Sequence, residues 1–88
     1  MTDHIPQIID AICEIDASQR PESLNAGTFF DADLGFDSGS FIEMFLILEE
    51  TIDGFTLGST RLETQDFATP GSLSAFITRR MTELEVAA

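Results

Sequence analysis

The sequence has 88 residues, enough for one small domain, and 43% of them are hydrophobic, so a thin core can form. The 16 Asp and Glu outnumber the 4 Lys and Arg and give a net charge of -12, which argues against nucleic acid and anionic membranes as partners, because phosphate binding needs clustered cations. One Cys, one His and no Tyr exclude an internal disulfide, a multi-thiolate metal site and a nucleophile–base pair.

Apolar residues recur at steps of three and four positions between Asp3 and Ile15, which predicts one amphipathic helix. Pro6 fits its first turn, where a missing amide hydrogen costs nothing. We expect Cys13 to be a small buried hydrophobe rather than a nucleophile. His4 is expected at the surface, near a frayed terminus. The apolar stripe consists of Ile5, Ile8, Ile9, Ile12 and Cys13.

A long structured loop is predicted over residues 17–36, where Pro, Gly, Asn and Ser are mixed with scattered apolar anchors. A short turn is expected within it, from Glu22 to Asn25. Loops of this length are uncommon in compact domains and are often functional when present.

A second helix is predicted from Ser38 to about Thr51, and Asp53-Gly54 is expected to end it. A connector over residues 55–63 follows, with Phe55 and Leu57 turned inward. The helix's core stripe is expected to be Phe41, Phe45, Leu48 and Ile52, with Met44 beside it.

One further turn is predicted around Thr64 to Ala68, anchored by Phe67. The last helix is expected to open near Thr69-Pro70 and to continue through Met81. Arg79 and Arg80 are expected close to its C-terminal end, where cations suit the helix dipole.

The expected fold class is therefore all-α: a bundle of three main helices plus one short helix, with a long loop between the first and second helices. A single domain is expected over residues 1–88, with its folded part at about 3–82. No signal-like segment opens the chain and no apolar run approaches a membrane span, so we expect a soluble cytoplasmic monomer.

The segment "DADLGFDSGSFIEMF" places three aspartates beside Ser38 and admits three interpretations. A calcium loop is disfavoured, because frames starting at Asp31 or Asp33 put Ile42 or Met44 where the family of such loops has Glu. Asp37 alone is well explained as a helix N-cap. The third interpretation is that Ser38, at a solvent-facing helix start, is modified with a phosphate-bearing group.

The segment "DLGFDSGSFIEMFLILEETI" resembles the acyl carrier protein signature, in which a Leu-Gly-x-Asp-Ser element opens the second helix and a Glu-Glu pair follows. A first amphipathic helix, a long loop, "DGF-x-L" and "F-x-TPGSLSAFI" also occur in carrier-protein order, and the last is similar to carriers of polyketide and peptide synthesis. The resemblance covers residues from about 3 to 82.

This resemblance implies that Ser38 takes a 4'-phosphopantetheine arm from coenzyme A, transferred by a phosphopantetheinyl transferase that uses magnesium. The arm would hold an acyl, aminoacyl or polyketide group as a thioester, and the protein itself would be a carrier, not an enzyme. Asp37 would cap the helix and be recognised by the transferase. The implied partners are that transferase, a loading ligase or acyltransferase, and downstream enzymes with basic docking patches.

The resemblance also places Ile42, Glu43, Leu46 and Glu50 at outward positions that the family uses for docking. Taken alone, the two glutamates are ordinary surface charges and an exposed leucine is common. Gly39 departs from the family, which usually has a large apolar residue after the modified serine. That departure argues against primary fatty-acid synthesis and suggests a dedicated partner that approaches closely beside the arm.

The sequence therefore favours a discrete acyl or peptidyl carrier in polyketide, nonribosomal peptide or related specialised metabolism. An aminoacyl or D-alanyl-type carrier, whose serine lies in the same place, is the alternative within the family. An acidic non-enzymatic adaptor without a prosthetic group is the alternative of another class.

Overall fold

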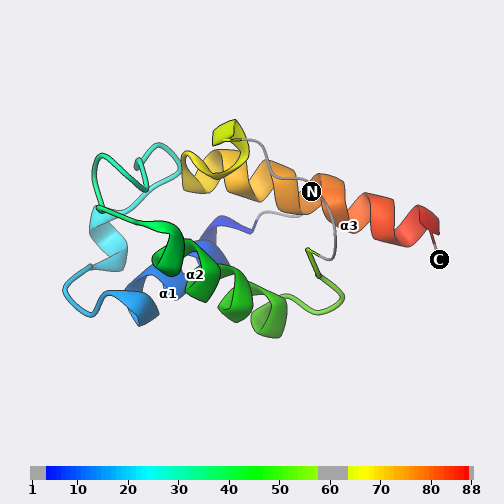
Figure 1. Cartoon of the computed structure of the whole chain (residues 1–88), viewed down its shortest axis with the longest axis horizontal. Helices are drawn as coiled ribbons and strands as arrows, with labels where there is room; N and C mark the ends of the chain where they lie inside the picture. Colours follow the sequence, from blue (N-terminus) through cyan, green and yellow to red (C-terminus); the bar gives the residue numbers. More distant parts are fainter. Residues whose placement is uncertain (1–3, 58–63, 88) are drawn as a thin grey trace.

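The computed structural model describes residues 4–57 and 64–87. Within them the elements are α1 (Ile5–Ile15), the short 3-10 helix η1 (Pro21–Ser23), α2 (Ser38–Thr51), the 3-10 helix η2 (Thr64–Phe67) and α3 (Pro70–Ala87). Figure 1 shows the three main helices, the loop that joins α1 to α2, and η2 beside the first turns of α3. The described part of the chain contains no strand, and the predicted all-α fold is confirmed.

The core lies where the apolar faces of the three helices meet. Ile8 and Ile12 of α1, Met44 and Leu48 of α2, and Ile77 of α3 are fully buried. Burying a side chain of this kind contributes about 1.5–3 kcal/mol. The core cluster also contains Ala11, Leu24, Phe30, Phe36, Phe45, Ile52, Phe55, Leu73 and Phe76.

Hydrogen bonds attach the long loop to the start of α3. The amide of Phe30 donates to the carbonyl oxygen of Ala68 at 3.0 Å, and the amide of Gly71 donates to that of Ala26, also at 3.0 Å. Gly35 takes a φ of 69°, a left-handed conformation that glycine adopts without steric cost, and it precedes the buried Phe36. The loop that leads into α2 is therefore held against the start of α3.

The predicted helix boundaries hold in most places. The second helix has the expected bounds, the last one begins at Pro70, and the turn near residue 64 is η2. The turn expected from Glu22 to Asn25 forms slightly earlier, as η1. The expected start of the first helix at Asp3, and residues 58–63 of the connector, lie outside the described residues. Among the described residues, no helix combines the length and apolar character needed to cross a membrane.

His4 was expected at the surface, and that prediction is wrong. His4 is only 5% exposed, and its backbone amide donates a hydrogen bond to the Ser74 hydroxyl oxygen at 3.1 Å. The physical reason is tertiary: His4 occupies the N-cap position of α1, and packing of α1 against α3 encloses it.

The placement of Arg79 and Arg80 near the end of the last helix is also wrong, because α3 continues to Ala87. Both side chains instead form tertiary contacts. An Arg79 guanidinium nitrogen, Nη2, donates to Oδ1 of Asp66 at 2.7 Å, and Arg80 Nε donates to the carbonyl oxygen of Thr56 at 2.9 Å. The arginines tie α3 to η2 and to the segment after α2.

Candidate functional site

The first turn of α2 presents a serine beside a capping aspartate. Asp37 has an extended backbone, and its Oδ1 accepts hydrogen bonds from the Ser40 amide at 2.9 Å and the Ser40 hydroxyl at 3.2 Å. The predicted N-cap is confirmed. Ser38 is the first residue of α2 and is exposed, and its hydroxyl makes no hydrogen bond to any residue that the structure describes. The Ser38 side chain is thus accessible from solvent at the start of α2.

The electrostatics of this turn follow from the cap. Hydrogen bonds from the Ser40 amide, and then from its hydroxyl, lower the pKa of Asp37 below its ordinary value of 3.8. The carboxylate therefore stays ionised and keeps capping the helix at any pH near neutral. A negative group attached to Ser38 would lie at the positive end of the α2 dipole.

The other two aspartates of the acidic segment serve the loop. Asp33 Oδ2 accepts from the Phe29 amide at 2.8 Å, and Asp31 Oδ1 accepts from the Ala32 amide at 2.7 Å. Within residues 4–57 and 64–87, no group of three or more His, Cys, Asp or Glu side chains could hold a metal ion. These carboxylates thus shape the backbone that leads to Ser38.

An apolar hollow begins at Ser38. It has a volume of about 360 Å³, and its walls come from α2, from the segment after α2 and from η2. Besides Ser38, the lining residues are Phe41, Ile42, Phe45, Leu57 and Phe67. The sequence predicts most of these side chains in the core, and their place beside the serine depends on the contact of the Phe67 ring of η2 with Phe41.

One exposed stripe of α2 runs away from Ser38. Ile42 is 61% exposed and Leu46 is 58% exposed, although both are large apolar residues. Gly39, Glu43 and Glu50 are exposed as well, and each of these five residues lies three or four positions from another of the set, which places them on one helix face. The structure therefore brings together, at the surface, the four residues that the resemblance places at docking positions and the neighbouring Gly39: Gly39, Ile42, Glu43, Leu46 and Glu50.

The fold does not require glycine at position 39. A Cβ built there would meet only the Asp37 Oδ1 atom, at 3.4 Å, which is ordinary contact, and Gly39 has no positive φ. A Cβ would therefore meet no backbone or core atom. With glycine at this position, no side chain covers the surface next to Ser38.

Glu49 has a structural role that the sequence did not reveal. Its Oε2 accepts hydrogen bonds from the Leu57 amide at 2.9 Å and from the Thr56 hydroxyl at 3.2 Å. This holds the segment after α2 against the helix and so forms one wall of the hollow beside Ser38. The first member of the Glu-Glu pair therefore belongs to the fold, whereas Glu50 is exposed.

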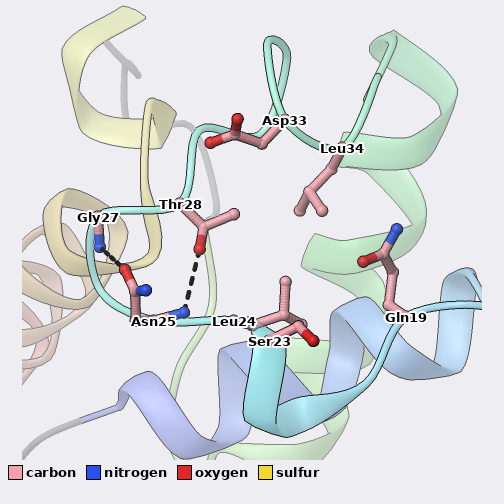
Figure 2. A pocket seen from close by; sticks show the side chains of 8 residues that line it. All are labelled: Gln19, Ser23, Leu24, Asn25, Gly27, Thr28, Asp33 and Leu34. Atoms are coloured by element: carbon pink, nitrogen blue, oxygen red, sulfur yellow. Dashed lines mark hydrogen bonds between the residues drawn. The ribbon is translucent and has the colours of Figure 1, made fainter.

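A second hollow, of about 400 Å³, lies within the long loop, and Figure 2 shows its side chains. Asn25 organises one wall: its side-chain Oδ1 accepts a hydrogen bond from the Gly27 amide at 2.8 Å, and its backbone amide donates one to the Thr28 hydroxyl at 3.0 Å. Gln19 donates a hydrogen bond from Nε2 to Oδ2 of Asp16 at 3.2 Å. Because these polar groups already bond within the loop, the hollow is best explained as part of the loop's own architecture.

Together these features give a small all-α fold with an exposed serine at a helix start. The serine lies between an apolar hollow and the exposed stripe of apolar and acidic residues on α2. No protein-family model, curated protein or solved structure matches the chain.

Proposed function

We propose that this protein is a discrete acyl or peptidyl carrier that holds a biosynthetic intermediate on a 4'-phosphopantetheine arm attached to Ser38. The observation that carries the proposal is the position of Ser38: exposed, first in α2, and directly after the capping Asp37. In the carrier proteins that the sequence resembles, the modified serine stands at this position.

The residues around Ser38 fit such a group. Its hydroxyl has no partner to give up among the described residues, and the neighbouring first-turn backbone favours a phosphodiester. In the attachment step, Ser38 Oγ bonds to the phosphorus of the pantetheine phosphate of coenzyme A. The pyrophosphate P–O bond breaks, adenosine 3',5'-bisphosphate leaves, and the serine proton passes to a base on the transferase. When bound, the arm supplies a thiol that carries cargo as a thioester.

The protein's own contribution is then to hold and present. The exposed stripe of Gly39, Ile42, Glu43, Leu46 and Glu50 offers apolar contacts flanked by carboxylates. An enzyme with a basic patch would be attracted by the net charge of -12, and this attraction would weaken with added salt. The apolar centre of the stripe would supply the contact area once the two proteins meet.

The test is the intact mass after incubation with coenzyme A, magnesium and a broad-specificity phosphopantetheinyl transferase. Wild-type protein should gain one phosphopantetheine, and Ser38→Ala should gain none. Ser40→Ala is the matched control: it removes a hydroxyl two residues away but keeps the backbone amide that Asp37 caps, so it should still be loaded.

A folded wild type that gains no mass beside a working positive control would overturn the carrier proposal and favour an acidic adaptor. A gain that survives Ser38→Ala would place the attachment elsewhere. If loading succeeds, parallel reactions with an adenylating ligase and with an acyltransferase will separate an aminoacyl or D-alanyl-type carrier from an acyl carrier.

A further inference from the structure

Two apolar hollows adjoin on the face next to Ser38. The near one, of about 360 Å³, begins at Ser38 itself. The far one, of about 330 Å³, is lined by Phe29, Asp31, Phe41, Phe67 and Ala68. Phe41 and Phe67 line both hollows, and their rings make an edge contact with a centroid separation of 5.0 Å. This pair therefore divides what would otherwise be one groove running from Ser38 to Phe29.

The two rings of the partition are held differently. Phe41 stands on α2 and also packs edge-on against Phe30 and Phe36, each with a centroid separation of 5.5 Å. Phe67 belongs to η2, a helix of only four residues, and its described ring contact is with Phe41. Phe67 also packs, partly buried, against the core. Displacing Phe67 breaks one of the ring contacts, whereas displacing Phe41 breaks three, so displacement of Phe67 costs fewer ring contacts.

Charge and exposure indicate what the groove would accept. Its walls are apolar except for Ser38 at one end and the exposed carboxylate of Asp31 at the other. A ligand carboxylate would lose hydration against the phenylalanines and would meet the negative charge of Asp31. A neutral ring can make edge contacts with the phenylalanine rings that line the walls. It would also cover Phe29 and Ile42, which are 50% and 61% exposed without it.

We propose that Phe67 is a movable, specificity-determining partition, and that the groove from Ser38 to Phe29 binds a neutral aryl group at the end of the cargo. The inference rests on the proposed carrier function and adds to it a substrate class: ring-bearing acyl groups without a free carboxylate. The Asp66–Arg79 ion pair, at 2.7 Å, fixes η2 on α3 and so positions Phe67 for this role.

The experiment compares two cargoes that differ only at the tip. A broad-specificity transferase loads Ser38 from 3-phenylpropanoyl-coenzyme A or from 3-carboxypropanoyl-coenzyme A, and intact mass confirms each product. Isotope-labelled protein then reports by NMR whether the cargo ring contacts the Ala68 methyl and the Phe29 ring. We expect such contacts, with shifts at Phe67, for the phenyl cargo and none for the carboxylate cargo.

Two variants test the partition. Phe67→Ala should strengthen the contacts between the cargo ring and Ala68, because no side chain has to be displaced. Ile9→Ala is the control: Ile9 also packs partly buried against the core, on α1, but lines neither hollow. It should leave the cargo contacts as in wild type, which separates an effect on the groove from general loosening of the domain.

Each result decides something. The inference is overturned if the phenyl cargo of the loaded protein makes no contact with Phe29 or Ala68. It is also overturned if the phenyl and carboxylate cargoes make equal contacts with these residues. Either result leaves the carrier function standing. An equal response to Phe67→Ala and Ile9→Ala also overturns the inference. Protein that gains no mass from either thioester overturns the proposed function, and the cargo groove with it.

Discussion

The amide of Gly71 donates a hydrogen bond to the carbonyl oxygen of Ala26 at 3.0 Å, which joins the middle of the long loop to the first turn of α3. This approach is possible because position 71 has no side chain. A Cβ there would lie 3.0 Å from the Ala26 carbonyl oxygen and 3.3 Å from the Ala26 Cβ. A side chain at position 71 would therefore force the Ala26 backbone to shift by a few tenths of an ångström, unlike one at Gly39, whose Cβ would meet only Asp37 Oδ1 at 3.4 Å.

We expect Gly71→Ala and Gly39→Ala to shift stability in opposite directions. Alanine in a helix is favoured over glycine by about 1 kcal/mol, so Gly39→Ala should raise the free energy of unfolding by up to about that amount. At position 71, crowding against backbone should cost about 1–3 kcal/mol and outweigh the propensity gain. Thermal unfolding monitored by circular dichroism measures both. Equal stabilisation by the two variants would show that the loop yields easily at Ala26.

The helices were predictable because their signals are local. The apolar period, Pro6 and Pro70 in first turns, and Asp53-Gly54 after the second helix all act within a few residues, and the helices form where they indicate. The loop was not predictable in the same way. The burial of Phe30 depends on a hydrogen bond to Ala68, and that of His4 depends on α3, so both are set by residues far away in the sequence.

A second prediction compares two leucines on opposite faces of α2. Leu48 is fully buried in the core, and Leu48→Ala should lower the free energy of unfolding by about 2–5 kcal/mol, a large part of what a domain of this size has. Leu46 is 58% exposed, and Leu46→Ala should change stability by less than about 0.5 kcal/mol. Urea titration gives both values. A large loss for Leu46→Ala would mean that this side chain belongs to the core and not to the exposed stripe.

A third prediction concerns the ion pair between Arg79 and Asp66. The Asp66 side chain is only 11% exposed, whereas that of Arg79 is 63% exposed, so solvent weakens the pair from one side. Arg79→Gln should lower the free energy of unfolding by about 1 kcal/mol, and 1 M salt should reduce the difference from wild type. The control is Arg20→Gln in the exposed loop, expected within about 0.5 kcal/mol of wild type. Matching losses in the two variants would contradict a specific role for Arg79.

The candidate site was predictable in part, for a related reason. Asp37 and Ser38 are adjacent in the sequence, so the cap and the exposed hydroxyl follow from local helix geometry. The hollow beside Ser38 was not predictable, because Phe67 reaches Phe41 only through the packing of η2. The role of Glu49 was not predictable either, because its hydrogen bonds to Thr56 and Leu57 join residues seven and eight positions apart.

A fourth prediction addresses the exposed Gly39. A Cβ there makes only an ordinary contact with Asp37 Oδ1, so Gly39→Leu should fold with stability close to wild type or slightly above it. If a dedicated partner approaches closely beside the arm, Gly39→Leu should raise the KM of its loading reaction about tenfold, which corresponds to a clash of about 1.4 kcal/mol. A generic transferase serves as the comparison. Loading rates equal to wild type with every partner tested would remove the case for close approach.

The fifth prediction follows from the ionisation of Asp37. In the folded protein, hydrogen bonds from the Ser40 amide and then the Ser40 hydroxyl lower the pKa of Asp37 below its ordinary value of 3.8. A carboxyl whose pKa is lower in the folded than in the unfolded state stabilises the fold fully above its unfolded pKa. That contribution is lost as the pH falls through about 4 and below the folded value.

Asp37→Asn isolates this effect, because asparagine is also a good N-cap but carries no charge. Urea unfolding between pH 7 and pH 2.5 should show wild type more stable than Asp37→Asn near neutral pH, with the difference shrinking as the pH falls below about 4. Ser40→Ala removes only the hydroxyl donor and keeps the amide, the larger cause of the shift, so it should retain most of the pH-dependent difference. A difference between wild type and Asp37→Asn that stays constant across this range would mean that the cap acts through geometry alone, without help from the charge.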